Sequence, residues 1–313
     1  MMDRISERKI IIIKRKTRLE ELVARYNTVS QAKFYIEHLG ADFSDYINEN
    51  ENYKNAVNEA FEILSYFGRV QILDREYVPN YIFGNEDLVV VIGQDGLVAN
   101  TLKYLTNQLL IGVNPDSKRW EGVLLPFTVS DLKFVVADVL NKKMKVKEVT
   151  MAKATLNDGQ VIYGVNDLFI GQKTHISARY HLYHGNYNEE QSSSGIIIST
   201  GLGSTGWLKS ILSGAFNIVN TIYKNSNLSR DNTKINWDVN YLYYSIREPF
   251  PSRNTKANLV FGKISKDKPL KVLSSMTENG VIFSDGIEDD FLQFNSGIEA
   301  SITVAEKKGH LVT

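Results

Sequence analysis

The stretch Asp87–Ile92 (DLVVVI), followed at once by Gly93–Gly96 (GQDG), decides the fold of the first half of the chain. An unbroken run of β-branched apolar residues is typical of a strand buried on both faces of a parallel sheet. A helix is predicted directly after the glycines, at 97–107. Further strands are predicted at 9–13, 70–73 and 109–113, and further helices at 17–40 and 51–67. Alternating strands and helices predict an α/β domain with a parallel sheet.

The second half of the chain, from about residue 143, has a different pattern of turn residues and apolar residues. Asn157-Asp158-Gly159 predicts a hairpin turn, and Asn279-Gly280 predicts another between the strand-like stretches on either side of it. Apolar residues alternate with polar ones over 298–304, as in a half-buried strand. The one clear helix is at 204–223. This half is therefore predicted to be mainly antiparallel β.

Composition narrows the class of protein. The chain has 313 residues, 36 basic and 36 acidic side chains, and no cysteine. Zero net charge argues against nucleic acid as the main partner, and the absence of cysteine excludes disulfides and thiolate chemistry. The longest apolar runs, such as Ile10–Ile13, are far shorter than the roughly 20 residues that span a bilayer. No membrane association and a cytoplasmic location are expected.

The Gly93–Gly96 loop is the first candidate site. Ligands of parallel sheets bind at the carboxyl ends of the strands. Glycine lets the backbone approach a phosphate, and the free N–H groups of the following helix attract anions. A carboxylate at Asp95 would repel that phosphate unless it held a metal ion or a substrate hydroxyl. The alternative is a tight turn in which Asp95 caps the helix.

A second glycine-rich segment, Gly201–Gly206 (GLGSTG), lies between a strand at 196–200 and the helix at 204–223. It lacks the lysine of a P-loop, so a Walker A site is excluded. The segment either binds a ligand or serves as a plain strand-to-helix turn, with Ser204 or Thr205 as the N-cap.

The third segment is Gly164–Leu168, where Asn166 and Asp167 interrupt an otherwise apolar strand. Polar side chains in a core need partners. An amide can bind the edge of an adenine, and a carboxylate can accept hydrogen bonds from two ribose hydroxyls. The alternative is a β-bulge or a sheet edge.

Two other polar groups are weaker candidates. His181 and His184 are three apart in a predicted strand, so they face opposite sides and are not expected to bind one metal ion. The acidic stretch Ser284–Asp290 (SDGIEDD) is interpreted as a solvated turn, with metal binding as the alternative.

Taken in order, the three segments resemble the NAD kinase family. The family's Gly-Gly-Asp-Gly loop matches Gly93–Gly96, and its Asn-Glu/Asp pair matches Asn166 and Asp167. Its Thr-Gly-Ser-Thr-Ala-Tyr stretch is similar to 202–207 (LGSTGW). The mitochondrial branch of the family is the nearest resemblance. Its likeness extends over 112–122, 165–171, 193–207, 245–249 and 294–301.

The resemblance implies a fold and a reaction. The fold is an N-terminal Rossmann-like α/β domain, 1–143, and a C-terminal antiparallel β-rich, sandwich-like domain, 144–313, with the site in the cleft between them. The C-terminal segment is expected to return to the first domain. The reaction is transfer of the ATP γ-phosphoryl group to the adenosine ribose 2′-hydroxyl of NAD, giving NADP, with Mg²⁺ on the phosphates. A homodimer or a higher homo-oligomer is implied.

The resemblance also assigns residues to roles. Asp95 would contact the accepting hydroxyl as base or positioner. Gly93, Gln94 and Gly96 would form the phosphate loop for ATP. The residues implied to bind NAD are Asn166, Asp167, Ser204, Thr205, Gly206, Trp207 and Arg247. Arg247 would contact a phosphate or lie on the nicotinamide side; the alternative for it is a surface arginine paired with a carboxylate. No residue is assigned as a metal ligand.

Two other functions stay open. One is a non-catalytic dinucleotide-binding module, in which Gln94, standing where the family has glycine, has impaired phosphoryl transfer. The other is a lipid or sphingoid-base kinase of the same superfamily, which shares the Gly-Gly-Asp-Gly loop.

Overall fold

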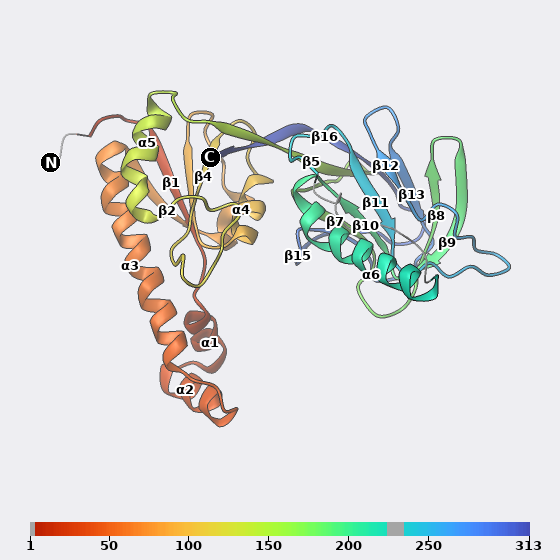
Figure 1. The fold of residues 1–313 in the computed structure, drawn as a ribbon, viewed down its shortest axis with the longest axis horizontal. Helices are drawn as coiled ribbons and strands as arrows, with labels where there is room; N and C mark the ends of the chain where they lie inside the picture. The colour runs from red at the N-terminus through yellow and green to blue at the C-terminus, as the bar shows by residue number, and fades with distance from the viewer. Residues whose placement is uncertain (1–3, 224–234) are drawn as a thin grey trace. The chain divides into compact units, whose positions relative to one another are not determined.

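The computed structural model describes residues 4–223 and 235–313 (Figure 1). The chain forms two compact units. The first contains the residues up to Lys147 together with His310–Thr313, and the second is Glu148–Gly309. The boundary expected from the sequence lies after residue 143.

A parallel sheet organises the first unit. Its strands are β1 (Lys9–Lys14), β2 (Arg69–Asp74), β3 (Leu88–Ile92) and β4 (Leu109–Val113), in the spatial order β2-β1-β3-β4. The last residues of β16 (Glu299–Val312) add a fifth strand, parallel to β4. Every residue of β3 is buried, as the sequence predicts for a central strand.

Helices cover both faces of this sheet. The long helix α3 (Ser44–Phe67) and helix α5 (Leu132–Leu140) pack on the face that carries Ile10, Ile12 and Val90. Helix α4 (Asp95–Leu102) lies on the other side of the strands (Figure 1). Short 3₁₀ turns, η1 (Arg75–Asn80) and η2 (Val129–Asp131), complete the connections. The α/β prediction is confirmed.

Three helices of the first unit differ from their predicted bounds. The helix predicted at 51–67 begins earlier, at Ser44. The segment 17–40 forms α1 (Arg18–Tyr26) and α2 (Val29–His38), because Asn27 has a positive φ of 67° and Thr28 caps a new helix. Helix α4 ends at Leu102 instead of 107. The side chain of Gln108 accepts hydrogen bonds from the amides of Thr106 and Asn107, which takes these residues out of the helix.

The second unit contains two sheets that pack face to face. One consists of β16, β13 (Leu270–Ser274), β8 (Ala178–His184) and β9 (Tyr187–Ser193). In addition, β5 (Val146–Leu156) pairs with β16, and β6 (Val161–Gly164) pairs with β5. The other has the order β12 (Phe261–Ile264), β11 (Leu242–Ile246), β10 (Ile196–Ser199), β7 (Asp167–Gln172), β14 (Gly280–Ser284) and β15 (Ile287–Gln293). All pairings within this second sheet are antiparallel.

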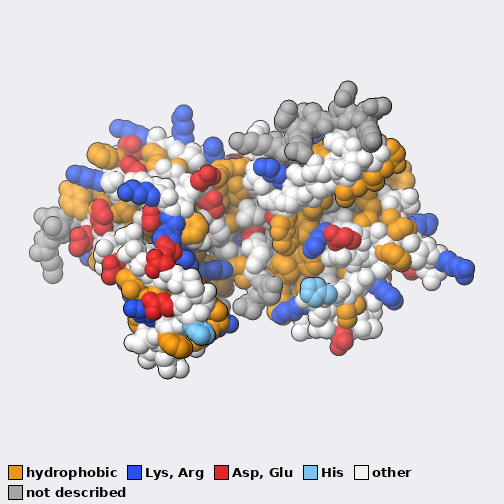
Figure 2. All heavy atoms as spheres, turned by 60° about the horizontal axis from the view of Figure 1, so that its bottom comes forward, with side chains coloured by type: hydrophobic (Ala, Val, Ile, Leu, Met, Phe, Trp, Pro, Cys, Tyr) orange, Lys and Arg blue, Asp and Glu red, His pale blue; other side chains and the backbone are white. Residues whose placement is uncertain are grey.

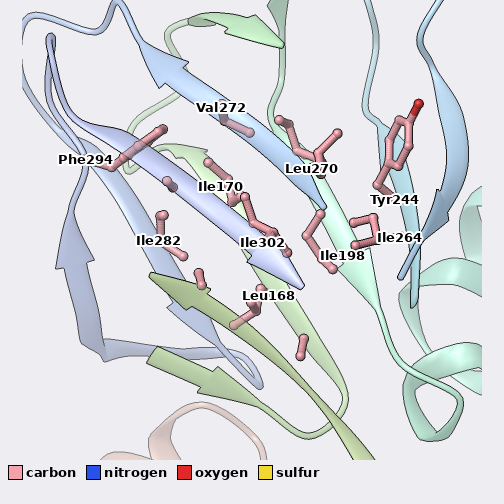
Figure 3. Packing of buried hydrophobic residues seen from close by; sticks show 14 of the residues in the cluster. Leu168, Ile170, Ile198, Tyr244, Ile264, Leu270, Val272, Ile282, Phe294 and Ile302 are labelled. Carbon is pink, nitrogen blue, oxygen red and sulfur yellow. The ribbon is translucent and has the colours of Figure 1, made fainter. Parts of the chain in front are cut away.

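A single apolar core lies between these two sheets (Figure 3). Leu168, Ile198 and Ile282 come from one sheet, and Leu270 and Ile302 come from the other; all five are fully buried. Alternating side chains supply this core, as the period-2 pattern of 298–304 predicts. The predicted β-rich, sandwich-like architecture is confirmed.

One hairpin prediction is right and one is wrong. β5 and β6 pair across Asn157-Asp158-Gly159 as expected. Asn279 has the positive φ of a turn residue, 57°, but it does not close a hairpin. The strand before it, β13, pairs with β16 and β8, and the strand after it, β14, pairs with β7 and β15. The turn therefore carries the chain from one sheet to the other.

The predicted helix at 204–223 begins later than expected. A 3₁₀ turn, η3 (Leu202–Thr205), comes first, and α6 (Trp207–Ile222) follows it. The apolar residues of α6 are only partly buried: Leu208 is buried, whereas Ile218 and Ile222 are exposed.

Charges of both signs are interspersed on the face that Figure 2 shows, in keeping with the zero net charge. Within 4–223 and 235–313, the structure has no helix with the length and apolar character of a membrane span.

Candidate functional site

The Gly93–Gly96 loop lies at the carboxyl end of β3 in the first unit. Gln94 has extended backbone angles, φ −123° and ψ 163°, and its carbonyl accepts the first helical hydrogen bonds, from Leu97 and Val98. The amides of Asp95 and Gly96 are first-turn donors of α4 and have no acceptor within the helix. A Cβ on Gly96 would meet no atom within 4 Å. The loop therefore combines two first-turn N–H groups with open space at the Cβ position of Gly96.

Asp95 holds the loop to a second segment. Its Oδ1 accepts a hydrogen bond from the Leu124 amide at 2.8 Å, and its Oδ2 accepts one from the Val123 amide at 3.0 Å. That segment also packs on the end of β4, where a Cβ on Gly112 would lie 2.0 Å from the Leu124 carbonyl oxygen. Asp95 is half-buried, and each of its oxygens keeps a second lone pair for a ligand. It does not cap α4, in contrast to the alternative considered from the sequence.

A tyrosine fixes the strand end in front of this loop. The hydroxyl of Tyr53, in α3, donates to the Ile92 carbonyl at 2.7 Å and accepts from the Arg15 amide at 2.9 Å. Burial raises the pKa of Tyr53 to about 12, so the hydroxyl stays protonated and keeps donating. The ends of β1 and β3 are thus held to one helix.

Asn166 and Asp167 lie at the turn between β6 and β7 in the second unit. Asp167 pairs with Ser199 across the strands β7 and β10. The Asn166 carbonyl accepts from the Thr200 amide at 3.0 Å, and the Val165 carbonyl accepts from the Thr200 hydroxyl at 2.6 Å. The turn is therefore held against the strand that leads into the glycine-rich segment.

The Asp167 carboxyl group is the most perturbed group of this turn. Its Oδ1 is buried and has no hydrogen-bond partner. Burial raises the pKa of Asp167 to about 7; a hydrogen bond with Ser199 lowers it and the negative charge of Asp285 raises it. A buried carboxyl oxygen without a partner is costly in a folded protein unless a ligand supplies the partner.

The glycines of the Gly201–Gly206 segment allow it to pack on this carboxyl group. A Cβ on Gly203 would lie 2.1 Å from the Asn166 carbonyl oxygen and 2.8 Å from Asp167 Oδ1, and one on Gly206 would lie 3.9 Å from Asp167 Oδ2. Ser204 is buried, and its hydroxyl donates to the Gly201 carbonyl at 2.7 Å. Thr205 and Gly206 are exposed at the start of α6.

Trp207 and Arg247 line a pocket of about 160 Å³ in the second unit. Trp207 is 41% exposed, and its ring meets the edge of Phe169 at a centroid distance of 6.4 Å. The other lining residues are Gln172, Lys173, Val281 and Phe283. Aromatic rings with two cations suit a planar ring that carries negative charge nearby. Arg247 also contacts Glu248 at 3.7 Å, as the surface alternative for this arginine expected.

Sequence reasoning missed several residues of these sites. Phe169, Lys173 and Phe283 line the pocket. Phe169 and Phe283 are apolar strand residues and Lys173 directly follows β7, so their residue types alone give no sign of a site. Asp285, interpreted as part of a solvated acidic turn, binds the backbone of the Asn166 turn through its carboxylate. The partners of Asp285 lie about 120 residues earlier in the chain, so no local pattern indicates them.

The two histidines behave as expected of opposite strand faces: His184 is buried and His181 is not. Across the described part of the chain, no three His, Asp or Glu side chains gather in a way that could hold a metal ion.

Comparison with known proteins gives a consistent result. No family model matches the chain. An NAD kinase of Clostridium tetani is 29% identical over 130 residues, which cover 39% of this chain and 46% of the clostridial protein. The aligned region thus spans about half the length of that relative.

Two solved structures cover nearly the whole chain. One is an NAD kinase from Archaeoglobus fulgidus in complex with ATP, which is 14% identical, with a TM-score of 0.57 over 98% of this chain and 93% of that one. The other is yeast NADH kinase complexed with NADH, which is 15% identical, with a TM-score of 0.57 over 99% and 84% of the two chains. The chain has the fold of these kinases, and the resemblance to NAD kinases is confirmed. The nearer likeness to the mitochondrial branch stays a prediction.

Proposed function

We propose that the chain is an NAD kinase, which transfers the γ-phosphoryl group of ATP to the 2′-hydroxyl of the adenosine ribose of NAD. The observation that carries the proposal is the buried, partnerless Oδ1 of Asp167 beneath the Gly203 turn. A ribose hydroxyl or an adenine amino group is the donor that this oxygen lacks. The similarity to NAD kinases and the order of the three motifs support the same assignment.

The second unit provides the dinucleotide site of this proposal. Asn166 and Asp167 bind the adenosine, with hydrogen bonds to the base edge and the ribose. Trp207 stacks on a ring, while Thr205 and Gly206 leave the start of α6 accessible. Arg247 and Lys173 lie beside the same aromatic pocket and balance the negative charge of the pyrophosphate.

The first unit provides the phosphate-donor site. The free amides of Asp95 and Gly96 at the start of α4 bind phosphate oxygens of ATP, aided by the helix dipole. Gln94 contributes its backbone, which is extended there. Mg²⁺ fits this scheme as an ion carried by the ATP phosphates, since Mg²⁺ is commonly bound through substrate phosphates with few protein carboxylates. Bound Mg²⁺ would neutralise charge that develops on the transferred group.

Asp95 acts on the accepting hydroxyl. In the reaction the ribose oxygen forms a bond to the γ-phosphorus, the bond to the ADP oxygen breaks, and the hydroxyl proton leaves. The free lone pairs of Asp95 can accept that proton and align the oxygen for in-line attack. Its bonds to Val123 and Leu124 restrict the carboxylate to one orientation.

The test is NADP formation by the purified chain with NAD, ATP and Mg²⁺, followed with an NADP-specific dehydrogenase. Turnover that is lost in Asp95→Asn, with folding retained, is the expected result. Tight NAD binding without turnover would favour a dinucleotide-binding module instead. ATP turnover stimulated by a short-chain sphingoid base, and not by NAD, would favour the lipid kinase.

The proposal extends to assembly and location. A homodimer or higher homo-oligomer is expected from the resemblance, and a cytoplasmic location is expected from the composition. Light scattering on the purified chain measures the first, and fractionation of cells that express it measures the second.

A further inference from the structure

The turn between β14 and β15 consists of Asp285 and Gly286, both with positive φ, 55° and 71°. These are the angles of a tight turn in which both central residues are left-handed, a conformation that Asp and Gly tolerate best. The strand register also shifts at the boundary of Phe283 and Ser284. The chain thus adopts an uncommon backbone conformation at Asp285.

This conformation brings the Asp285 carboxylate to the backbone of the Asn166 turn. Oδ1 accepts hydrogen bonds from three consecutive amides, Val165 at 3.0 Å, Asn166 at 2.6 Å and Asp167 at 3.3 Å. Oδ2 accepts a further bond from the Val165 amide at 3.1 Å. In return, the Asp285 amide donates to the Asp167 carbonyl at 3.0 Å. Hydrogen bonds from N–H groups to a charged acceptor are stronger than neutral ones.

We propose that Asp285 is a positioning residue, which holds the backbone of Asn166 and Asp167 in the conformation that binds the dinucleotide. This inference rests on the proposed function. A turn that leaves the sheet just before β7 has no other strand to satisfy three amides in a row, and one carboxylate satisfies all of them. The directions of the Asn166 and Asp167 side chains follow from that fixed backbone.

The charge of Asp285 has a second effect on the same site. Its negative charge raises the pKa of Asp167, because two carboxylates that lie close together disfavour ionisation. The other groups that face Asp167 are uncharged: Ser199 from β10 and the Gly203 turn. Burial is the larger cause of the raised pKa of Asp167, and the charge of Asp285 adds to it.

Two substitutions of Asp285 distinguish the effect of its hydrogen bonds from the effect of its charge. Asp285→Asn keeps an acceptor oxygen and removes the negative charge, whereas Asp285→Ala removes both. Asp158→Asn is the matched control. Asp158 also binds a backbone amide in a hairpin turn, that of Gln160 at 2.9 Å, but it contacts none of the proposed site residues.

The first measurement is hydrogen exchange of the amides of 165–167, which needs no enzymatic activity. We expect exchange to accelerate about tenfold or more in Asp285→Ala, less in Asp285→Asn, and not at all in the control, because the bonds from these amides are lost in that order. Unchanged exchange in Asp285→Ala would overturn the inference, whatever the activity of the chain. Absence of NADP formation by the wild type, with altered exchange in the variant, would overturn the proposed function alone.

The second measurement separates a role toward the dinucleotide from a general structural role. Asp285→Ala should raise the KM for NAD about tenfold and leave the KM for ATP within about twofold. In Asp285→Asn, the pH midpoint for NAD binding should move down, since the like charge is gone. Equal losses for NAD and ATP, or an unmoved midpoint, would contradict the positioning role.

Discussion

The two glycine-rich turns look alike in the sequence but use glycine for different physical reasons. Gly93–Gly96 and Gly201–Gly206 each connect a strand to a helix. In the first, a Cβ on Gly96 would meet nothing within 4 Å. In the second, a Cβ on Gly203 would lie 2.1 Å from the Asn166 carbonyl oxygen, and one on Gly201 would lie 2.0 Å from the Asn236 carbonyl oxygen. The first turn is open at Gly96, and the second is closed upon its own protein at Gly201 and Gly203.

The two turns therefore use glycine for different purposes. In the open turn, Gly96 leaves free space, whereas a Cβ on Gly93 would lie 2.9 Å from Leu97 Cδ2. In the closed turn, glycine lets the segment pack on the Asn166 turn, so that Asp167 is buried and its pKa rises to about 7. Under the proposed function, the carboxyl group of Asp167 binds the ligand in the second unit, and Gly203 serves to pack the segment on it.

The largest expected effect is on the closed turn. Gly203→Ala places a methyl group against backbone, which cannot move aside as a side chain does, so we expect a loss of about 3 kcal/mol or more in the free energy of unfolding. Chemical denaturation measures it. Gly214→Ala is the matched control, because a Cβ at Gly214 within α6 would meet no atom within 4 Å. A loss below about 1 kcal/mol in Gly203→Ala would show that the close approach is not rigid.

The next effect concerns the carboxylate of the open turn. Asp95→Asn should lower kcat for NADP formation about a hundredfold or more, because an amide neither accepts the hydroxyl proton nor aligns the oxygen as well. Its stability should fall by about 1 kcal/mol, since an amide NH₂ must face the Val123 or the Leu124 amide. Steady-state kinetics and thermal unfolding measure the two losses. Full activity in the variant would contradict the mechanism proposed for Asp95.

The third effect is a pH dependence that belongs to the closed turn alone. Burial raises the pKa of Asp167 from its usual value of 3.8 to about 7, so between these pH values the folded protein holds a proton that the unfolded chain releases. The contribution of this group to the free energy of unfolding should therefore be largest below pH 4. It should fall by roughly 4 kcal/mol as the pH rises from 4 to 7. Comparison of wild type and Asp167→Asn in unfolding experiments from pH 5 to 8 measures it.

In Asp167→Asn this part of the pH dependence should vanish. A ligand that donates hydrogen bonds to the ionised carboxylate has the opposite dependence: NAD affinity should weaken as pH falls below about 7. Equal slopes of stability against pH in both proteins would contradict the raised pKa.

The smallest effect is on the stability of the open turn. Gly96→Ala should leave the free energy of unfolding unchanged or raise it by up to about 1 kcal/mol, because alanine favours the helix and meets no neighbour. Affinity for ATP should fall severalfold, since the methyl group occupies space proposed for a phosphate. Calorimetric titration with ATP measures this. A loss of stability would show that the turn is closed like the other.

The sequence predicts what depends on local chemistry. The buried run of β3, the Asn157-Asp158-Gly159 hairpin and the alternation along β16 follow from period and turn residues, and all are confirmed. The chemistry of Asn279 also indicates a turn correctly. Its strand partners depend on pairing with distant segments, and the hairpin prediction is wrong for that reason.

The sequence likewise indicates some residues of the candidate site and not others. Gly93–Gly96, Asn166 and Trp207 stand out because their residue types carry chemistry in the sequence itself. Asp285 does not, because its importance comes from amides about 120 residues away and from an unusual backbone angle. The pKa of Asp167 is likewise a product of burial, which no local pattern reports.

Strand β16 has a consequence for how the chain is made. The first unit is discontinuous: residues up to Lys147 and residues from His310 onward belong to it, and His310 and Leu311 pair with Leu109 and Leu110. During synthesis, β4 can pair with β3 early, but its other edge has no partner strand until the whole second unit has been translated. Until then its open edge is exposed to wrong pairing, a hazard of non-local sheet contacts. Folding of the inserted second unit brings its two ends together, so that the end of β16 can pair with the open edge of β4.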